Sequence, residues 1–570
     1  MPSFDLVSHE WIPVLDAGTD LRATSHAPLT LREVGLRDAL VRAHEIREVY
    51  TDSPLETIAL YRLLLALALD VYQPTPDVDR WIALWRAGRF PAEPLDAYLS
   101  DAHRGHQRFD LLHPDRPWYQ SPIPDASQEG KAPAPLAKLF HAQASGNNAT
   151  LFGHDLDTRP DRLPLALAAR GLVATQSAAL GGGVSQPFNF SHAPLVGRAQ
   201  FWLRGRSLFE ALLFNGPPDE KARMGATERD APVWRRSLPK AYARRIHQGL
   251  LDVLTWPSRR LTLVTETQDG ETVATGVYPT QGDKLDPQPA NDPLAAHVAK
   301  KQEGTFPLGF RASRALWRDF STLFRVADPG EAGAPFTFRW ATELVKLVAP
   351  EEASELRLAF REHGIDAFGL TTKEGKAGVV EFWRHERLPL HIEILKDEAR
   401  MVALGNALES AEDGWSGTSK WPGLRAAIRT TAEYALAPPA PGDDGYPNAD
   451  PKAVSALARS LGASPRYWAL VEPSFFEFLR DLAAAATDAA RAYALASWRR
   501  AVSAAALVAF DAATSSFDHD ARHLRARTEG RARLARSDEE TGSPEAPTSL
   551  PASAPEPDPE PVPQLDFFAS

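Results

Sequence analysis

An alanine-rich run from Pro473 to about Asp511 limits the possible folds of the C-terminal part of the chain, because it contains no strand-like segment. At a rise of 1.5 Å per residue, a helix of about 40 residues would form a rod of about 60 Å. Its many alanines would let neighbouring helices approach closely. Segments 391–410 and 421–437 also have helical patterns. The simplest prediction for residues 391–535 is therefore an antiparallel four-helix bundle.

The first 390 residues have a mixed pattern of short strands, helices and loops rich in Gly and Pro. The opening segment 4–15 alternates weakly and contains aromatic and β-branched residues, which predicts a strand. A helix is predicted to begin after Ser53, whose side chain can cap it, and Pro54 suits its first turn. The Glu56 side chain can accept a hydrogen bond from the backbone at the start of this helix. Two further segments have a strand pattern, namely 261–267 and 378–383. Without a repeat or a regular βαβ alternation, we predict an α+β fold whose residues 1–390 form one large, irregular mixed α/β domain.

Residues 536–570 form a third predicted region, a tail rich in Pro and acidic residues. No Lys or Arg follows Arg536, whereas eight acidic residues do, so the tail supplies most of the formal net charge of −11. A segment of this composition has little apolar surface to bury, and we predict that it is disordered. Its LDFF ending is either a docking motif or part of a solubilising tail.

The composition excludes several classes of function. The chain has no cysteine, which rules out disulfides, thiol catalysis, iron–sulfur clusters and cysteine-ligated zinc. Its longest apolar stretch is interrupted by Arg62 and is too short to cross a bilayer, and its N-terminus lacks the pattern of a signal peptide. We therefore expect a cytoplasmic protein with no membrane segment and no cofactor.

Motifs that would indicate catalysis are weak. Segment 369–377 resembles a phosphate-binding P-loop, but its glycines are one residue too far apart, and Ala377 replaces the hydroxyl that would hold magnesium. We predict no catalytic residue and no metal site. The alternative function is a metal-dependent hydrolase or nuclease of irregular α+β fold, using His154 or His192 with nearby acidic residues.

Two loops have the composition of a nucleic-acid contact. The first combines Gly and paired Asn residues, which favour tight turns with exposed amides, with an aromatic side chain. The second has three consecutive glycines, which suit a backbone that passes close to a phosphate or a groove. The candidates are Asn147, Asn148 and Phe152 in the first loop and Gly181, Gly182 and Gly183 in the second. The alternatives are an Asn-rich turn with a buried Phe and a flexible connector.

A third candidate loop carries cations and precedes the predicted strand at 378–383. We place Thr371, Thr372, Lys373 and Lys376 in a turn between a helix and this strand, at a loop tip or the tip of a β-hairpin. The two lysines could contact phosphates there. The alternative is a hairpin whose lysines are simply solvated.

Basic residues gather in two stretches of the chain, at 221–245 and at 522–536. Such runs are usually solvated faces. Two of them in an acidic protein nevertheless favour a polyanionic partner, because the local field rather than the net charge attracts phosphate.

Several segments, taken in order, resemble the CasA family, the large subunit of the type I-E CRISPR surveillance complex Cascade. They are FDLVSHEWIPV at 4–14, RPWYQ at 116–120, KLFHAQASGNNATLFGH at 138–154, QSAALGGGVS at 176–185 and the late helical region. No single motif is diagnostic, but their order and spacing make the resemblance specific.

The resemblance implies a DNA-recognition subunit with no catalytic activity, in which a large mixed α/β domain precedes a four-helix bundle. Its implied partners are target double-stranded DNA, CRISPR RNA and the other Cascade subunits. It would read the protospacer-adjacent motif mainly from the minor groove and start strand separation. It would then recruit the nuclease-helicase.

The resemblance also assigns roles to residues. An aromatic residue of the family lies where Phe152 falls, and the family's glycine loop corresponds to the three glycines named above. Two positions depart from the family pattern. Its mid-chain lysine falls at Gln281, with Lys284 nearby, and its wedge-forming Asn-Gln pair falls at Gly375-Lys376. Both departures affect which motif the protein would read.

Overall fold

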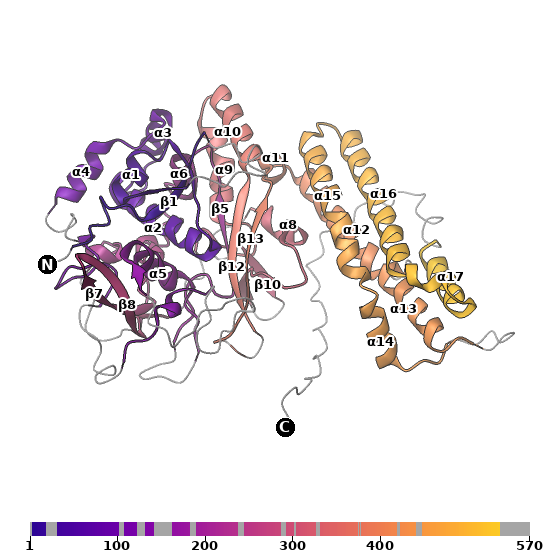
Figure 1. Cartoon of the computed structure of the whole chain (residues 1–570). Helices are drawn as coiled ribbons and strands as arrows, with labels where there is room; N and C mark the ends of the chain where they lie inside the picture. Colours follow the sequence, from indigo (N-terminus) through magenta and orange to yellow (C-terminus); the bar gives the residue numbers. More distant parts are fainter. Residues whose placement is uncertain are drawn as a thin grey trace. The chain divides into compact units, whose positions relative to one another are not determined.

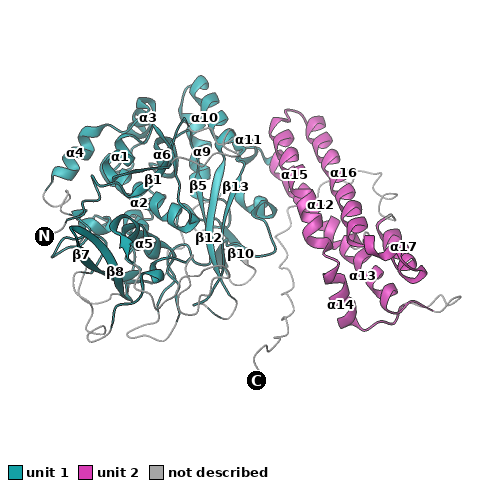
Figure 2. Ribbon diagram, viewed as in Figure 1, with its two compact units in different colours: residues 1–398 teal, residues 399–570 magenta. Residues whose placement is uncertain are grey.

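The structure is a computed structural model in which the chain divides into two compact units, residues 1–398 and 399–570 (Figure 2). It describes residues 3–18, 31–101, 108–121, 132–141, 162–182, 190–236, 244–286, 292–300, 304–326, 331–373, 376, 378–418, 422–439 and 447–535. The first unit mixes helices with small sheets and the second is helical, which confirms the predicted mixed N-terminal and helical C-terminal regions. The tail predicted at 536–570 lies outside the described residues.

Small sheets, rather than one continuous sheet, organise the first unit (Figure 1). Among the described residues, three sheets have three strands each, in the orders β2-β1-β3, β13-β12-β5 and β4-β8-β7, and the pairs β10-β11 and β6-β9 form two more. The strands are β1 (Ile12–Asp16), β2 (Arg32–Val34), β3 (Ile46–Val49), β4 (Leu163–Pro164), β5 (Ala199–Leu203), β6 (Arg244–Arg245), β7 (Arg259–Gln268), β8 (Glu271–Gln281), β9 (Lys284–Leu285), β10 (His297–Lys300), β11 (Gly304–Pro307), β12 (Ile365–Thr372) and β13 (Val380–Leu388). Strands β7 and β13 confirm the predicted strands at 261–267 and 378–383.

A central helix, α2, carries the core of the first unit. Every residue of α2 except Pro54 and Thr57 is buried, as expected for a helix that is apolar on all faces. The single cation in its middle, Arg62, is 1% exposed and donates hydrogen bonds to Gln200 Oε1 at 2.8 Å and to Val253 O at 3.0 Å. The helices of this unit are α1 (Leu36–Val41), α2 (Pro54–Tyr72), α3 (Val78–Ala87), α4 (Ala92–Ser100), α5 (Leu165–Ala178), α6 (Leu208–Asn215), α7 (Leu250–Leu254), α8 (Phe320–Leu323), α9 (Phe336–Leu347), α10 (Pro350–His363) and α11 (Ile392–Leu395).

Two local predictions for the first unit are wrong in part. The strand expected at 4–15 begins only at Ile12, because the Asp5 carboxylate accepts the Val7 N–H at 3.0 Å and folds the preceding residues into turns. The helix expected after Ser53 begins as predicted at Pro54, but the Ser53 side chain makes no capping hydrogen bond. Glu56 does not reach back either, since it pairs with Arg170 at 3.2 Å.

Six α-helices, rather than four, make up the described part of the second unit. Two pairs pack side by side, α15 with α16 and α13 with α17 (Figure 1). Within the described part of the chain, no helix combines the length and the apolar character that crossing a bilayer requires. The helices are α12 (Glu398–Ser416), α13 (Gly423–Leu436), α14 (Pro451–Ser460), α15 (Ala463–Ala484), α16 (Asp488–Ala513) and α17 (Ala521–Ala535).

The predicted single rod between Pro473 and about Asp511 is wrong. The run belongs to two helices that fold back on each other, and Pro473 lies inside α15 rather than at the start of a helix. The break follows from a capping signal, because the Thr487 side chain accepts the Ala490 N–H at 3.2 Å and starts α16. Trp498 then packs against Phe475, with ring centroids 5.6 Å apart.

Two glycines of α12 test how closely these helices pack. A Cβ atom on Gly414 would collide with the Tyr467 hydroxyl and lie 2.7 Å from Val502 Cγ1, whereas one on Gly405 would meet nothing within 4 Å. We expect Gly414→Ala to lower the free energy of unfolding by about 1–3 kcal/mol through overpacking. In the matched control Gly405→Ala, higher helix propensity should raise it by up to about 1 kcal/mol. Thermal and urea unfolding of the two variants measure this, and effects of the same sign would contradict the packing described.

Candidate nucleic-acid interface

The structure describes six of the eleven candidate residues. They are Gly181, Gly182, Gln281, Lys284, Lys373 and Lys376. Five others lie outside the described residues, namely Asn147, Asn148, Phe152, Gly183 and Gly375, as does His154. The described candidates come from three segments of the first unit: the start of the loop after α5, the strands β8 and β9, and the β12–β13 hairpin.

The first two glycines of the glycine loop, defined here as Leu180–Gly182, are held in place rather than loose. Gly182 has a φ of +97°, which disfavours any side chain, and its N–H donates to Phe190 O at 2.9 Å. Gly181 is buried, and a Cβ atom there would lie only 2.7 Å from His192 N. Close backbone packing therefore explains both glycines, which argues against a flexible connector in the described part of this loop.

Residues 190–197, here called the strap, join the glycine loop to the hairpin. One side of the strap bonds to the end of α5 and the residue after it, and the other side bonds to Leu370 of β12. The hydrogen bonds are Ala193 N to Ala179 O (3.0 Å), Leu195 N to Ser177 O (2.9 Å), Gly197 N to Leu370 O (2.8 Å) and Leu370 N to Leu195 O (3.2 Å). A Cβ atom on Gly378, just before β13, would also lie 3.9 Å from Gly181 O. The structure thus brings two of the three candidate segments together.

The cation-bearing loop is the tip of a β-hairpin, one of the two predicted placements, but the segment before it is strand β12 and not the predicted helix. Strands β12 and β13 pair antiparallel, and Lys373 N donates to Val379 O at 2.9 Å where the strands end. Lys373 and Lys376 are both exposed. Thr371 and Thr372 belong to β12 and not to the turn, because the ladder of strand hydrogen bonds extends further than the sequence suggested.

The mid-chain candidates differ in exposure. Gln281 ends β8 opposite Arg259 of β7, and it is only 4% exposed. Lys284 is half-buried in β9, where it pairs in parallel register with Arg244. Between the two, the exposure favours Lys284 as the residue that could reach a phosphate.

Arg259, which our sequence analysis did not single out, joins these segments. Its guanidinium donates to Leu180 O of the glycine loop and to Ser191 O of the strap, the latter at 3.1 Å. It also lies over the ring of Phe190, 4.7 Å from the centroid. The Gln176 side chain of α5 bonds the Arg259 backbone at 2.8 and 2.9 Å. An arginine at the start of a strand gives no local signal of such a role.

His192 belongs to the same cluster as Arg259. Its described neighbours do not form a recognisable catalytic site. Its Nδ1 accepts the Gly181 N–H at 2.9 Å, so the ring is neutral at that nitrogen. Burial lowers the pKa of His192, and the positive charges of Arg259 and Arg198 lower it further. These cations would also repel a divalent metal. Among the residues the structure describes, no group of three or more His, Asp or Glu side chains is arranged to hold a metal ion.

The His192 contact predicts a pH dependence. Because the pKa of His192 is lowered on folding, its neutral form contributes stability above about pH 6.5, the value of free histidine. That stability is lost as the pH falls below 6.5 toward the lower folded pKa, with a slope of at most about 1.4 kcal/mol per pH unit. We expect His192→Asn, which keeps an acceptor but does not titrate, to lose less stability on acidification than the wild type. Parallel profiles of melting temperature against pH would contradict this.

Several arginines of the two basic stretches are bound to acidic side chains or carbonyls within the protein. In the first, Arg235 pairs with Asp70 and Arg236 pairs with Asp252, both at 2.5 Å. Arg245 pairs with the same Asp252 and also with Asp283. In the second, Arg522 donates to the last carbonyl of α13, at Leu436. These arginines therefore stabilise the fold. The proposal of a polyanionic partner does not depend on them.

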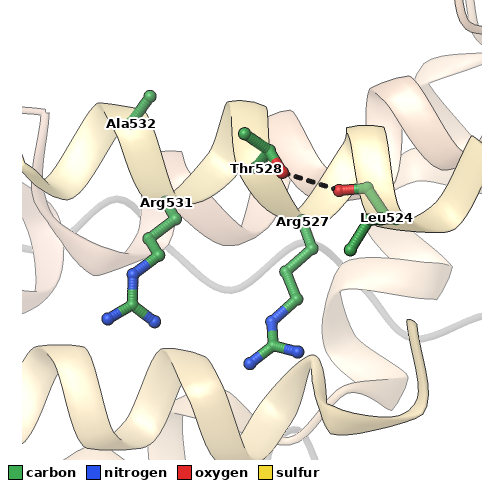
Figure 3. Close-up of a pocket in the computed structure, with 5 residues that line it drawn as sticks. All are labelled: Leu524, Arg527, Thr528, Arg531 and Ala532. Atoms are coloured by element: carbon green, nitrogen blue, oxygen red, sulfur yellow. Dashed lines mark hydrogen bonds between the residues drawn. The ribbon is translucent and has the colours of Figure 1, made fainter. Parts of the chain in front are cut away.

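A pocket of 390 Å³ lies on α17 of the second unit (Figure 3). Its lining consists of Leu524, Arg527, Thr528, Arg531 and Ala532. Arg527 forms ion pairs with Asp518 and Asp511, and Arg531 also pairs with Asp511. Because both guanidinium groups already face carboxylates, we assign no ligand to this pocket.

Comparisons with known proteins identify the class of the protein. The chain is 31% identical over 546 residues to the CRISPR-associated protein CasA/Cse1 of Thermus thermophilus, covering 93% of this chain and 96% of that protein. The structure of Thermus thermophilus CasA (Cse1) matches at 26% identity with a TM-score of 0.72, over 94% of this chain and 99% of that one. A chain of a CRISPR RNA-guided surveillance complex shares the fold at 22% identity and a TM-score of 0.67, over 94% and 100% of the two chains. The protein is thus of the CRISPR-associated class.

A family model gives the narrower identification. The model of the CRISPR-associated protein Cse1 matches residues 5–509. The chain belongs to the Cse1 family, also called CasA, which confirms the resemblance found in the sequence. The match covers the first unit and most of the helical unit.

Proposed function

We propose that this chain is the non-catalytic large subunit of a CRISPR RNA-guided surveillance complex and that it recognises the protospacer-adjacent motif in duplex DNA. Family membership supports the first part, as does the occurrence of the same fold in a chain of such a complex. The observation that carries the second part is the junction of the glycine loop, the strap and the lysine-bearing hairpin in one connected cluster.

The geometry suits a short and shape-dependent reading of DNA. Pairing with guide RNA delegates most sequence recognition to the nucleic acid, so the protein has only a short duplex motif to read. The minor groove presents few distinguishing groups, and backbone loops with a cation match such a groove better than a recognition helix would. We assign Gly182 and Gly183 to the groove and Lys284 to a phosphate, whereas Gly181, which is buried, holds the loop backbone close to the strap.

Strand separation and recruitment form a third part of the proposal. The β12–β13 hairpin would insert next to the motif, with Lys376, the sequence neighbour of Gly375, at its tip and Lys373 on a phosphate. The polar loop with Asn147, Asn148 and Phe152 would contact the same DNA. After target binding, the complex would recruit the nuclease-helicase.

Co-purification tests the proposal against the alternative of a metal-dependent hydrolase or nuclease. The tagged chain, expressed with the genes of a type I-E system, should co-purify with small CRISPR RNA and with other Cascade subunits. In parallel, the isolated chain is incubated with duplex and single-stranded DNA in the presence of Mg²⁺, Mn²⁺ or Zn²⁺. Cleavage that depends on the metal, without any associated RNA, would favour the enzyme instead.

A further inference from the structure

We infer that Arg259 is a positioning residue that fixes the glycine loop against the strap and thereby sets the discrimination between motif-bearing and other duplexes. The second half of this inference, the discrimination between duplexes, rests on the proposed function. The first half concerns the fold of the loop alone and can be tested without DNA.

One guanidinium group adds two hydrogen bonds to a contact in which Gly182 N–H already donates to Phe190 O and Gly181 N–H to His192 Nδ1. Arg259 donates to the carbonyls of Leu180 and Ser191, and its face covers the ring of Phe190. Leu180 O directly precedes Gly181 in the glycine loop, and Ser191 lies in the strap. The planar arrangement of donors in arginine can serve both carbonyls and the ring at once, whereas the ammonium group of lysine cannot reproduce that fork.

The anchor of Arg259 is itself rigid. Its backbone belongs to β7, pairs with Gln281 of β8 and exchanges two hydrogen bonds with the Gln176 side chain. The backbone of Arg259 is therefore fixed by a sheet and by helix α5, and its side chain in turn fixes the glycine loop. A loop placed in this way is suited to a close approach to a groove, where small displacements reduce binding strongly.

The charge of Arg259 supports the same role. Arg259 is 7% exposed, and burial lowers its pKa to about 10, so it remains protonated at neutral pH. Among the described residues, no carboxylate forms an ion pair with it, and carbonyl oxygens and the Phe190 ring surround the charge instead. A cation without a carboxylate partner gives the glycine loop a positive potential that favours a DNA phosphate.

The test compares Arg259→Lys, which keeps the charge but loses the fork, with Arg260→Lys as the matched control. Arg260 is the next residue of β7, is 8% exposed and lies 3.8 Å from Asp283. Hydrogen exchange is measured on the full-length chain for peptides covering 176–182 and 190–197. We expect Arg259→Lys to speed exchange there by about tenfold or more, as expected for lost charge-assisted hydrogen bonds, and the control to leave it unchanged.

The second readout is the ratio of affinities for a motif-bearing and a motif-scrambled duplex, measured with the chain assembled in its complex. Arg259→Lys should lower this ratio by about tenfold or more, with little change for the scrambled duplex. Should Arg259→Lys unfold, Phe190→Leu removes the ring beneath the guanidinium and should loosen the same peptides to a smaller degree.

The outcomes separate the inference from the proposed function. Unchanged exchange in Arg259→Lys, or in Phe190→Leu if the first unfolds, overturns the positioning role. Faster exchange with an equal loss of affinity for both duplexes overturns the role in discrimination and leaves a purely structural one. A wild-type complex that does not discriminate between the duplexes overturns the proposed function, and this is seen before any variant is examined.

Discussion

With Gly182 replaced by Asp, we expect the affinity for a motif-bearing duplex to fall by at least about 100-fold, which corresponds to about 2.7 kcal/mol. Gly182 borders the groove in the proposed complex, so a carboxylate there would face phosphates. Two like charges 4 Å apart repel by about 4 kcal/mol at an effective dielectric constant near 20. The positive φ of Gly182, +97°, adds backbone strain of about 1–2 kcal/mol for any side chain.

Two control variants separate charge from strain. Gly182→Ala has the same strain without the charge, and we expect a loss of affinity below about tenfold. Gly270→Asp adds the same charge at a glycine with a φ of +86° in the turn between β7 and β8, where a Cβ atom would meet nothing within 4 Å. It should leave motif binding unchanged. Equal affinities for Gly182→Asp and the wild type, with normal melting temperatures, would mean that the glycine loop does not approach DNA.

The second large effect is expected at the hairpin tip. Lys376→Ala should slow strand opening by about tenfold or more, because unstacking a base step costs a few kcal/mol and a wedge must offset it. Initial binding should change much less. Strand opening is measured with a fluorescent base analogue next to the motif, using the chain assembled in its complex.

Lys373→Ala is the matched control for this prediction, since both lysines are exposed in the same turn. If Lys373 only contacts a phosphate, its removal should weaken binding to all duplexes and reduce the slope of log K against log salt by about one unit. A pre-opened bubble should rescue Lys376→Ala but not Lys373→Ala. If the bubble rescues neither variant, Lys376 is an electrostatic contact and not a wedge.

Local patterns predicted the elements whose signals are contained within a few residues. The strand GVVEFW was predicted because strand alternation is short-range, whereas the segment before the loop was expected to be a helix and is strand β12. Short-range signals also predicted the helix that starts at Pro54 and the helical character of the C-terminal unit. The break between α15 and α16 was also local, in Thr487 and Asp488, but the surrounding alanines obscured it.

The organisation of the candidate site depends on contacts that no local pattern contains. Gln176, Ser191 and Arg259 meet from three separate parts of the chain, and only the folded backbone brings them together. Conversely, both basic stretches looked like binding surfaces, although acidic residues distant in sequence pair with several of their arginines, as Asp70 does with Arg235. Charge counted along the sequence is therefore a weaker guide than charge counted in space.

Selection from a duplex library with a randomised motif tests the proposed function most directly. The guide-matched target is kept constant, and binding is measured for the reconstituted surveillance complex with and without this chain. We predict that a short motif beside the target is enriched only when the chain is present, and that Gly182→Asp abolishes the enrichment. The same motif enriched without the chain, or no motif enriched with the wild-type chain, would contradict its assignment as the motif-recognising subunit.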